Sequence, residues 1–277
     1  MAKVGRYGLR GKRMLRKCTA EDEMILKKYL EQEQEYNTFL LADIAAYGFE
    51  NQCQDVWMEW EENTCKGIYL RFYTNLLVYS KDDGLQRSSI QTILKSFPVF
   101  VIMGKSSALK DISEFLAEHY RCVEKRLYKL GTTEKLYTIE ETAGQSGVLQ
   151  AEESDVDDIF HFLGKIPEIR ALYTSKEMIR DRIVSGDGVH LFICEDGQII
   201  SHGNSTTEAE KTAMIGGLAT EEEHRRKGYA SKVLSALCRY ILARGKTPCL
   251  FSDCRLQALF EKLGFECLGG WSTLERI

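Results

Sequence analysis

The most regular hydrophobic pattern of the chain lies in residues 212–243. Residues 212–220 are largely apolar or small and predict a strand, and a polar stretch follows them. From Ala230 onward, apolar residues recur at intervals of three and four, which predicts an amphipathic helix with one buried face. These apolar positions are Ala230, Val233, Leu234, Leu237, Cys238 and Ile241.

The turn between this strand and this helix is basic and contains small residues. Arg225, Arg226 and Lys227 directly precede Gly228, and Ala230 stands two positions further on. A helix that begins at Gly228 would direct its unpaired N–H groups and the positive end of its dipole at the turn. Small residues would also let a phosphate approach the backbone closely. The turn therefore predicts a site for an anion with several charges, above all a pyrophosphate.

The residues around this segment predict further alternation of strands and helices. Residues 190–208 are typical of two strands joined at the turn Asp196-Gly197. Residues 249–253 are typical of a short apolar strand, and a short helix that Gly264 ends follows them. Two more short strands are expected around Gly269-Gly270. The second half of the chain is thus expected to have a mixed α/β build.

A similar order of elements is expected ahead of a polar linker at 132–146. The expected strands are 14–19, 55–61, 67–80, 99–103 and 122–130, and the expected helices are 21–33, 38–47, 86–95 and 108–119. Where the second half has its basic turn, however, the first has Asp82 and Asp83, which would repel a pyrophosphate. We therefore expect a basic flexible tail (1–13), a degenerate first domain (14–131) and a working second domain (147–277).

The composition narrows the class of protein. Apolar residues make up 44% and charged residues 28% of the 277 residues, as in ordinary soluble proteins of two domains. The net charge is −4 and no apolar run could span a bilayer, so neither nucleic acid nor a membrane is an expected partner. The nine cysteines form no C-x-x-C pair and the histidines have no ligand spacing. This pattern predicts reduced thiols in the cytoplasm and no metal site.

The second half resembles the GNAT superfamily of N-acetyltransferases. Arg225, Gly228 and Ala230 match the acyl-coenzyme A loop pattern [QR]-x-x-G-x-[GA], and residues 259–265 resemble the family's closing pattern L-Y-x-x-x-G-F, with Phe260 in place of its tyrosine. The resemblance covers 147–277. It implies two GNAT-like domains, each a mixed, mostly antiparallel twisted sheet flanked by helices. It also implies acetyl-CoA as the acyl-donor cosubstrate.

Carried onto this sequence, the resemblance implies a set of cofactor contacts. The backbone N–H of Leu218 would stabilise the oxyanion of the thioester carbonyl. The strand before the loop would pair with the pantetheine arm, and the loop would bind the pyrophosphate. The double glycine Gly216-Gly217 suits a close backbone approach, although it can also mark a bulge without a function. The implied cofactor residues are Gly217, Leu218, Ala219, Arg225, Arg226, Lys227, Gly228, Tyr229, Ala230 and Phe260.

The remaining catalytic groups are less clearly marked. Glu221 is a candidate general base, because an amine must lose a proton before it attacks, but three consecutive acids also fit a solvated face. Phe260 lacks the hydroxyl with which the family's tyrosine can protonate the leaving thiolate. Glu195 is expected to be exposed and inert. The candidate acceptor-binding residues are Asn204, Ser252 and Asp253.

These features predict an N-acyltransferase that transfers acetyl from acetyl-CoA to a primary amine by direct attack in a ternary complex. One alternative is a non-catalytic acyl-CoA-binding regulatory protein, which Phe260 favours. Another is an aminoacyl transferase that uses charged transfer RNA, which would not need the basic loop. The acceptor (a small molecule or a peptide amine), the length of the acyl chain and the oligomeric state are left open.

Overall fold

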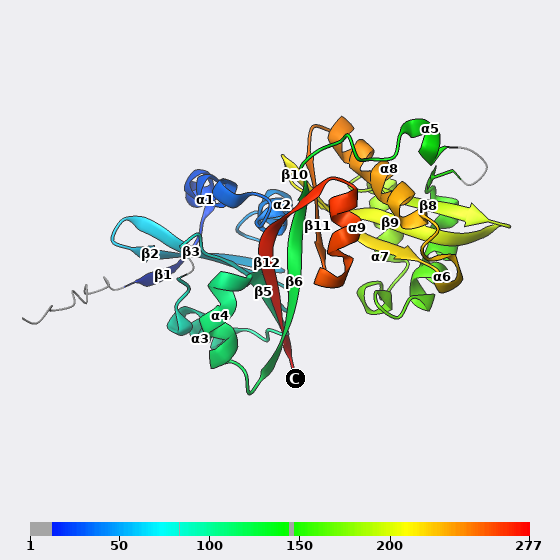
Figure 1. Ribbon diagram of the computed structural model, residues 1–277. Coiled ribbons are helices and arrows are strands. Elements are labelled where there is room, and N and C mark those ends of the chain that lie inside the picture. Colours follow the sequence, from blue (N-terminus) through cyan, green and yellow to red (C-terminus); the bar gives the residue numbers. More distant parts are fainter. Residues whose placement is uncertain (1–12, 83, 144–146) are drawn as a thin grey trace, which may run out of the picture. The chain divides into compact units, whose positions relative to one another are not determined.

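The computed structural model describes residues 13–82, 84–143 and 147–277 (Figure 1). Its contacts divide the chain into two compact units. Unit 1 comprises Met1–Glu33, Ala46–Val123 and Ser272–Ile277, and unit 2 comprises Gln34–Ala45 and Glu124–Trp271. The helices and strands of each unit confirm the expected fold class, a mixed and mostly antiparallel sheet flanked by helices.

This division differs from the expected boundaries at residues 131 and 147, because two segments belong to the unit that is distant in sequence. In the segment 34–45, the ring of Phe39 stacks on that of Phe251, and the Thr38 and Thr212 hydroxyls form a buried hydrogen bond of 2.8 Å. At the other end of the chain, the N–H of Ile277 donates to the carbonyl of His119. The stretch 132–143 lies within unit 2, so it does not separate the two units.

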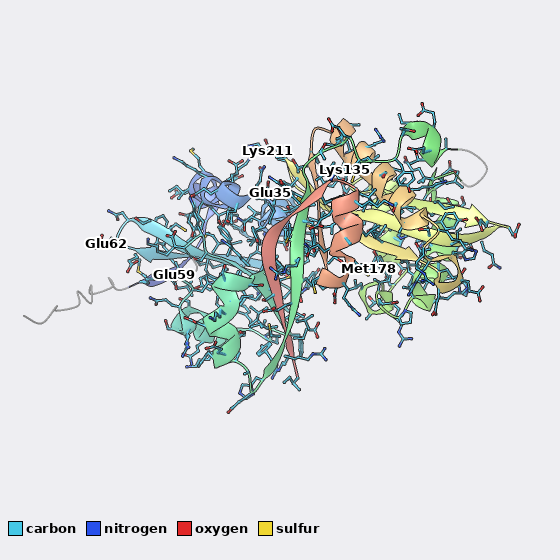
Figure 2. All side chains as sticks on the ribbon, viewed as in Figure 1. Glu35, Glu59, Glu62, Lys135, Met178 and Lys211 are labelled. Carbon is cyan, nitrogen blue, oxygen red and sulfur yellow. The ribbon has the colours of Figure 1, made fainter. Side chains whose placement is uncertain are left out.

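The expected basic tail (1–13) lies outside the described residues except for Arg13. The Arg13 side chain is only 8% exposed and forms ion pairs with Glu59 and Glu61. Glu59, labelled in Figure 2, is fully buried and also accepts hydrogen bonds from Tyr69 and Ser89. A buried carboxylate needs such partners, so Arg13 belongs to the folded part of unit 1.

Unit 1 is built on five successive strands and the helices that connect them. Strands β1 to β4 pair antiparallel in sequence order, and β4 pairs parallel with β5 through the crossover helix α3. The expected strand 67–80 is two strands, since a tight turn at Tyr73, whose φ is +50°, reverses the chain. The elements are β1 Met14–Lys17, α1 Glu23–Leu30, β2 Gln54–Glu61, β3 Thr64–Phe72, β4 Asn75–Tyr79, α3 Arg87–Ser96, β5 Val101–Lys105, α4 Ser106–Phe115 and the start of β6 Tyr120–Leu130.

Unit 2 repeats this order of elements. Its strands lie in the order β12-β6-β11-β10-β9-β8-β7. Strands β10 and β11, joined by α8, pair parallel, whereas β11 pairs antiparallel with β6, and β10, β9, β8 and β7 pair antiparallel in turn. The two short strands expected around Gly269-Gly270 are one long strand, β12. The elements are α2 Thr38–Tyr47, α5 Ile139–Thr142, β7 Leu149–Gln150, α6 Val156–Lys165, α7 Glu177–Ser185, β8 His190–Glu195, β9 Gln198–Glu208, β10 Thr212–Thr220, α8 Tyr229–Ala243, β11 Thr247–Ser252, α9 Gln257–Lys262 and β12 Phe265–Arg276.

Helices α8 and α6 cover opposite faces of the sheet in unit 2. On β8, Leu191 and Ile193 pack in the core cluster that contains α8, whereas Phe192 packs in the cluster that contains α6. Successive side chains of a strand point to opposite faces, so this alternation separates the two helices. The apolar face predicted for α8 is buried as expected, since Val233, Leu234, Leu237, Cys238 and Ile241 are each fully buried.

Gly264, which ends α9 as expected, offers a test of this fold. Its φ is +90°, and a Cβ atom there would collide with the carbonyl oxygen of Thr132. Gly264→Ala should therefore lower the free energy of unfolding by about 2–4 kcal/mol, because left-handed backbone and overpacking both cost energy. Gly164 on α6 has no atom within 4 Å of a built Cβ and is the matched control. Gly164→Ala should be neutral or stabilise by up to about 1 kcal/mol. Urea unfolding that gave similar midpoints for both variants would contradict this account.

Candidate functional site

Unit 2 contains a cavity of about 530 Å³ at the start of α8. One wall is the end of β10, and the others come from the loop before α8, from α9 and from the segment after α6. Most of the side chains that line it are apolar, and its charged groups gather near Gly228. Such a cavity suits a long ligand with an apolar arm and an anionic end.

Strand β10 separates from β11 where it borders this cavity. The parallel pairing runs from Thr212–Thr247 to Ile215–Leu250 and does not continue, although β10 extends to Thr220. On its other side, β10 pairs with β9 through a bulge between Gly216 and Ala219. The edge of β10 beyond Ile215 therefore has backbone groups with no partner in register on β11, next to a cavity that Leu218, Ala219 and Thr220 line.

A buried pair of histidines fixes the bulge. The Nδ1 atom of His202 lies 3.0 Å from the carbonyl oxygen of Gly217, so it carries the proton and donates. Its Nε2 atom then accepts from Nδ1 of His190 at 2.9 Å. Burial lowers the pKa of His202 to about 4 and that of His190 to about 3, so both rings are neutral near pH 7.

The hydrogen bond from His202 to the Gly217 carbonyl also orients the N–H of Leu218. In a trans peptide the carbonyl of one residue and the N–H of the next point in opposite directions, and none of the described peptide bonds is cis. Because the Gly217 carbonyl points at His202 within the sheet, the N–H of Leu218 points away from that ring. Gly217 has a φ of +56°, and a Cβ there would collide with the Tyr173 hydroxyl, so a side chain at this position would be strained and would displace Tyr173.

The start of α8 presents open backbone amides. Gly228 occupies the N-cap with a φ of +90°, and no side chain caps the helix. Within the described chain, the N–H groups of residues 226–231 have no acceptor, and the first amide to find one is that of Lys232, which donates to Gly228. Gly228, Tyr229, Ala230 and Ser231 all line the cavity. These amides and the helix dipole favour an anion at this position.

The three cations of the loop have different surroundings. Arg225 donates from Nε to the carbonyl of Thr220 at 3.0 Å and from Nη2 to Glu168 at 3.3 Å, so it braces the loop. Arg226 lines the cavity, is exposed, has a φ of +64° and has no partner among the described residues. Lys227 is exposed and likewise without a described partner, but it does not line the cavity. Arg226 is thus the cation best placed to meet an anion.

Glu195 is half-buried and has partners, whereas it was expected to be exposed. It accepts a hydrogen bond from the Tyr229 hydroxyl, and its other oxygen lies 3.4 Å from Nε2 of His224. The hydrogen bond to Glu195 raises the pKa of Tyr229. On its other side, His224 lies 3.4 Å from Glu221, the candidate base. These contacts fix the ring of Tyr229 at the first position of α8.

The candidate acceptor residues lie in separate places. Asn204 is buried beside the bulge, where its Oδ1 accepts from Thr206 at 3.1 Å and lies 3.5 Å from the Tyr173 hydroxyl. Asp253 caps the 3-10 turn before α9 and pairs with Arg255, which lowers the pKa of its carboxyl group. Neither Ser252 nor Asp253 is among the residues that line the cavity. The structure therefore brings Asn204, but not this pair, next to the bulge.

Phe260 is a core residue. Its side chain is 2% exposed and packs on the rings of Tyr128 and Phe265, and it does not line the cavity. The cofactor contact expected of Phe260 does not fit this burial. The wall from α9 is formed instead by Leu259 and Lys262.

Besides Leu256, Leu259 and Lys262 in and before α9, two groups of lining residues were missed from the sequence. Ile166, Glu168 and Ile169 follow α6, and Tyr137 precedes α5 in the stretch expected to be a linker. No periodicity or spacing marked them, because they reach the cavity only through long-range packing. The one indication in the sequence was the apolar and aromatic pair Leu136-Tyr137 within an otherwise polar stretch.

The loop before α3 in unit 1 differs from the loop before α8. There the Arg13 guanidinium donates to the carbonyl of Gly84, and the N–H of Gly84 donates to the Ser80 hydroxyl at 3.2 Å. Asp82 lies 3.7 Å from Lys66. The backbone groups of Gly84 are thus satisfied by the chain itself, and an acidic residue stands where the loop of unit 2 has cations.

Other kinds of site find no counterpart in the part of the chain that the structure describes. Its residues include no group of three or more His, Cys, Asp or Glu that could hold a metal ion. No described helix is long and apolar enough to cross a membrane. All nine cysteines are free.

Comparisons with known proteins give a family for part of unit 2 and similar folds for the chain. Residues 156–265 match the model of the acetyltransferase (GNAT) family. Among curated proteins, the search found no sequence match. Among solved structures, a GCN5-related N-acetyltransferase-like protein from Streptococcus suis 89/1591 is similar with a TM-score of 0.59 and 14% identity, over 94% of this chain and 100% of the other.

Two further structures extend the likeness over nearly the whole chain. A tandem GNAT protein from the clavulanic acid biosynthesis pathway has a TM-score of 0.57 and 10% identity, over 95% of this chain and 98% of its own. A Drosophila protein has a TM-score of 0.65 and 12% identity, over 96% and 99%. Identities this low show the fold alone. The family match identifies residues 156–265 of unit 2 as a GNAT acetyltransferase domain, and the chain as a whole shares the fold of these structures.

Proposed function

We propose that the protein transfers an acetyl group from acetyl-CoA to a primary amine, by direct attack within a ternary complex. The observation that carries the proposal is the cavity between the free edge of β10 and the uncapped start of α8. The amides of 226–231, with Arg226, would bind the diphosphate. The β11-facing edge of β10 at 217–219 would pair with the pantetheine arm, and Leu218 and Ala219 would contact it.

The oxyanion donor would be the N–H of Leu218. The hydrogen bond from His202 to the Gly217 carbonyl turns this N–H away from the ring and holds it in place. A donor that is fixed before the reaction stabilises the developing charge without reorganising, and one such donor is worth roughly 100-fold to 1,000-fold in rate. Glu221 would accept the proton of the amine through water. Because Phe260 replaces the family's tyrosine, no hydroxyl there protonates the leaving thiolate. The thiolate would leave unassisted, because the conjugate base of a thiol of ordinary pKa is only modestly basic.

In this proposal unit 1 is a degenerate copy that does not bind coenzyme A. Its loop before α3 is occupied by Arg13 and carries Asp82 where unit 2 has its cations. The sequence boundaries proposed above, 14–131 and 147–277, describe this tandem origin, whereas the compact units describe where contacts divide.

The test combines calorimetry with acetyl-CoA and an assay of thiol release with a panel of primary amines. We expect 1:1 binding to the full chain and release of free thiol with at least one class of amine. A protein that binds no acetyl-CoA would overturn the proposal. Binding without thiol release from any amine would support the second candidate, a non-catalytic acyl-CoA-binding protein. Phe260 does not separate the two candidates, since it is buried in the core and does not line the cavity.

A further inference from the structure

The segment 131–143 crosses α8 and α9 and is fixed at several points. The N–H groups of Gly131 and Thr132 donate to the carbonyl of Gly264. The ammonium group of Lys135, labelled in Figure 2, lies 3.3 Å from the carbonyl of Glu261 on α9. Leu136 is buried in the core of unit 2. We call this segment the strap.

The backbone of Tyr137, in the middle of the strap, is bound to α8 from both sides. Its N–H donates to the Ser235 hydroxyl at 3.1 Å, and its carbonyl accepts from Nε and Nη2 of Arg239 at 3.0 and 2.7 Å. Directly after it, Thr138 and Glu141 form a capping box that begins α5. The strap therefore holds the Cα of Tyr137 in place before any ligand binds.

The side chain of Tyr137 reaches the anionic end of the cavity. Its ring lines the cavity, and its hydroxyl lies 3.6 Å from the position of a Cβ built on Gly228. The hydroxyl has no partner among the described residues. A phenol O–H beside open amides is a further donor for the same anion.

We propose that Tyr137 is a cofactor-binding residue whose hydroxyl donates to the diphosphate of coenzyme A. This inference rests on the function proposed above. Tyr137 lies outside the stretch that matches the family, so this contact belongs to the strap of this chain. A ring whose backbone is already fixed loses little conformational freedom on binding, which favours affinity. The contact would also favour an acyl donor that carries a diphosphate over an acyl donor that lacks it.

The experiment measures how Tyr137→Phe binds acetyl-CoA and S-acetylpantetheine, which keeps the acyl arm but lacks the diphosphate. Affinity for acetyl-CoA comes from direct calorimetry, and affinity for S-acetylpantetheine comes from displacement of acetyl-CoA. We expect acetyl-CoA to bind roughly 5- to 10-fold more weakly, as for a lost hydrogen bond to a charged group, and S-acetylpantetheine to change by less than about twofold. Phenylalanine keeps the packing of the ring, so the variant should unfold at the wild-type temperature.

Tyr240→Phe is the matched control, because Tyr240 lies on α8 and packs against the same core but does not line the cavity. It should bind both compounds as the wild type does. Unchanged affinity of Tyr137→Phe for acetyl-CoA would overturn the inference while leaving the proposed function intact, and so would equal losses for the two compounds. A wild-type chain that binds no acetyl-CoA would overturn both.

Discussion

Replacing Arg226 and Lys227 together with glutamate should weaken acetyl-CoA binding by well over tenfold. Both side chains are exposed and without a described partner beside the open amides of α8, so their charge acts on the ligand and not on an internal ion pair. The change turns two positive charges into two negative ones next to a diphosphate, and it reverses the local field. Calorimetry with acetyl-CoA measures the effect, which should shrink at high salt because these charges are exposed.

The choice of these two positions follows from the contacts of their neighbour. Arg225 braces the loop through Thr220 and Glu168, so its replacement would disturb the loop as well as the charge. Lys125→Glu combined with Arg126→Glu is the matched control. These adjacent cations lie on β6 in the same unit, are exposed and do not line the cavity. Equal affinities of the two double variants would contradict the placement of the diphosphate.

The sequence predicted those parts of the site that local patterns determine. The helical periodicity from Ala230 to Ile241 identified α8, because a buried face of a helix must repeat at about 3.6 residues. The position of Gly228 identified the start of that helix, because only glycine adopts a φ of +90° there without strain. Since helix geometry then fixes the direction of the first amides, the open amides at the start of α8 could be predicted without any tertiary information.

The parts that were missed depend on which distant residues meet. Tyr137 lies in a polar stretch, and only the hydrogen bonds from Ser235 and Arg239 bring it to the cavity. Glu195 is the last residue of β8 and was expected to face solvent, but its carboxylate accepts a hydrogen bond from Tyr229, which is 34 positions later. Pairings of this kind are decided by packing, and no spacing along the chain encodes them.

The expected boundaries of the two halves differ from the compact units for the same reason. Thr38 and Phe39 lie in a helix that the pattern identified correctly. The pattern carries no information on whether that helix packs near Thr212 and Phe251 or near its sequence neighbours. Strand β12 is a second case in which the local pattern misled. The Gly269-Gly270 pair is typical of a turn, but here it lies within one strand.

The buried histidine pair should make the protein lose stability in mild acid. The pKa of His190 is lowered to about 3 and that of His202 to about 4, whereas an unfolded histidine titrates near 6.5. Between those values the unfolded chain binds more protons than the folded one, so the free energy of unfolding falls as pH falls below 6.5. At pH 5 each histidine should cost about 2 kcal/mol relative to pH 7.

Asp43 has the opposite effect on the free energy of unfolding between pH 7 and pH 5. Burial raises its pKa to about 6, so the folded chain holds a proton that the unfolded chain releases above pH 4. As pH falls from 7 to 5, this group adds about 1 kcal/mol of stability. The wild type should therefore lose about 3 kcal/mol in total, a large part of the stability of an ordinary domain.

Urea unfolding of the double variant His190→Asn/His202→Asn at pH 7 and pH 5 isolates the contribution of the pair. The variant should be less stable than the wild type at pH 7, because the hydrogen bond to the Gly217 carbonyl is lost, yet it should gain about 1 kcal/mol at pH 5, because Asp43 still takes up its proton. His190→Asn alone should reduce the loss between the two pH values from about 3 to about 1 kcal/mol. His161→Asn, which changes an exposed histidine on α6, should leave it as in the wild type. If the double variant lost as much as the wild type between the two pH values, the buried histidines could not be the groups that take up protons on unfolding.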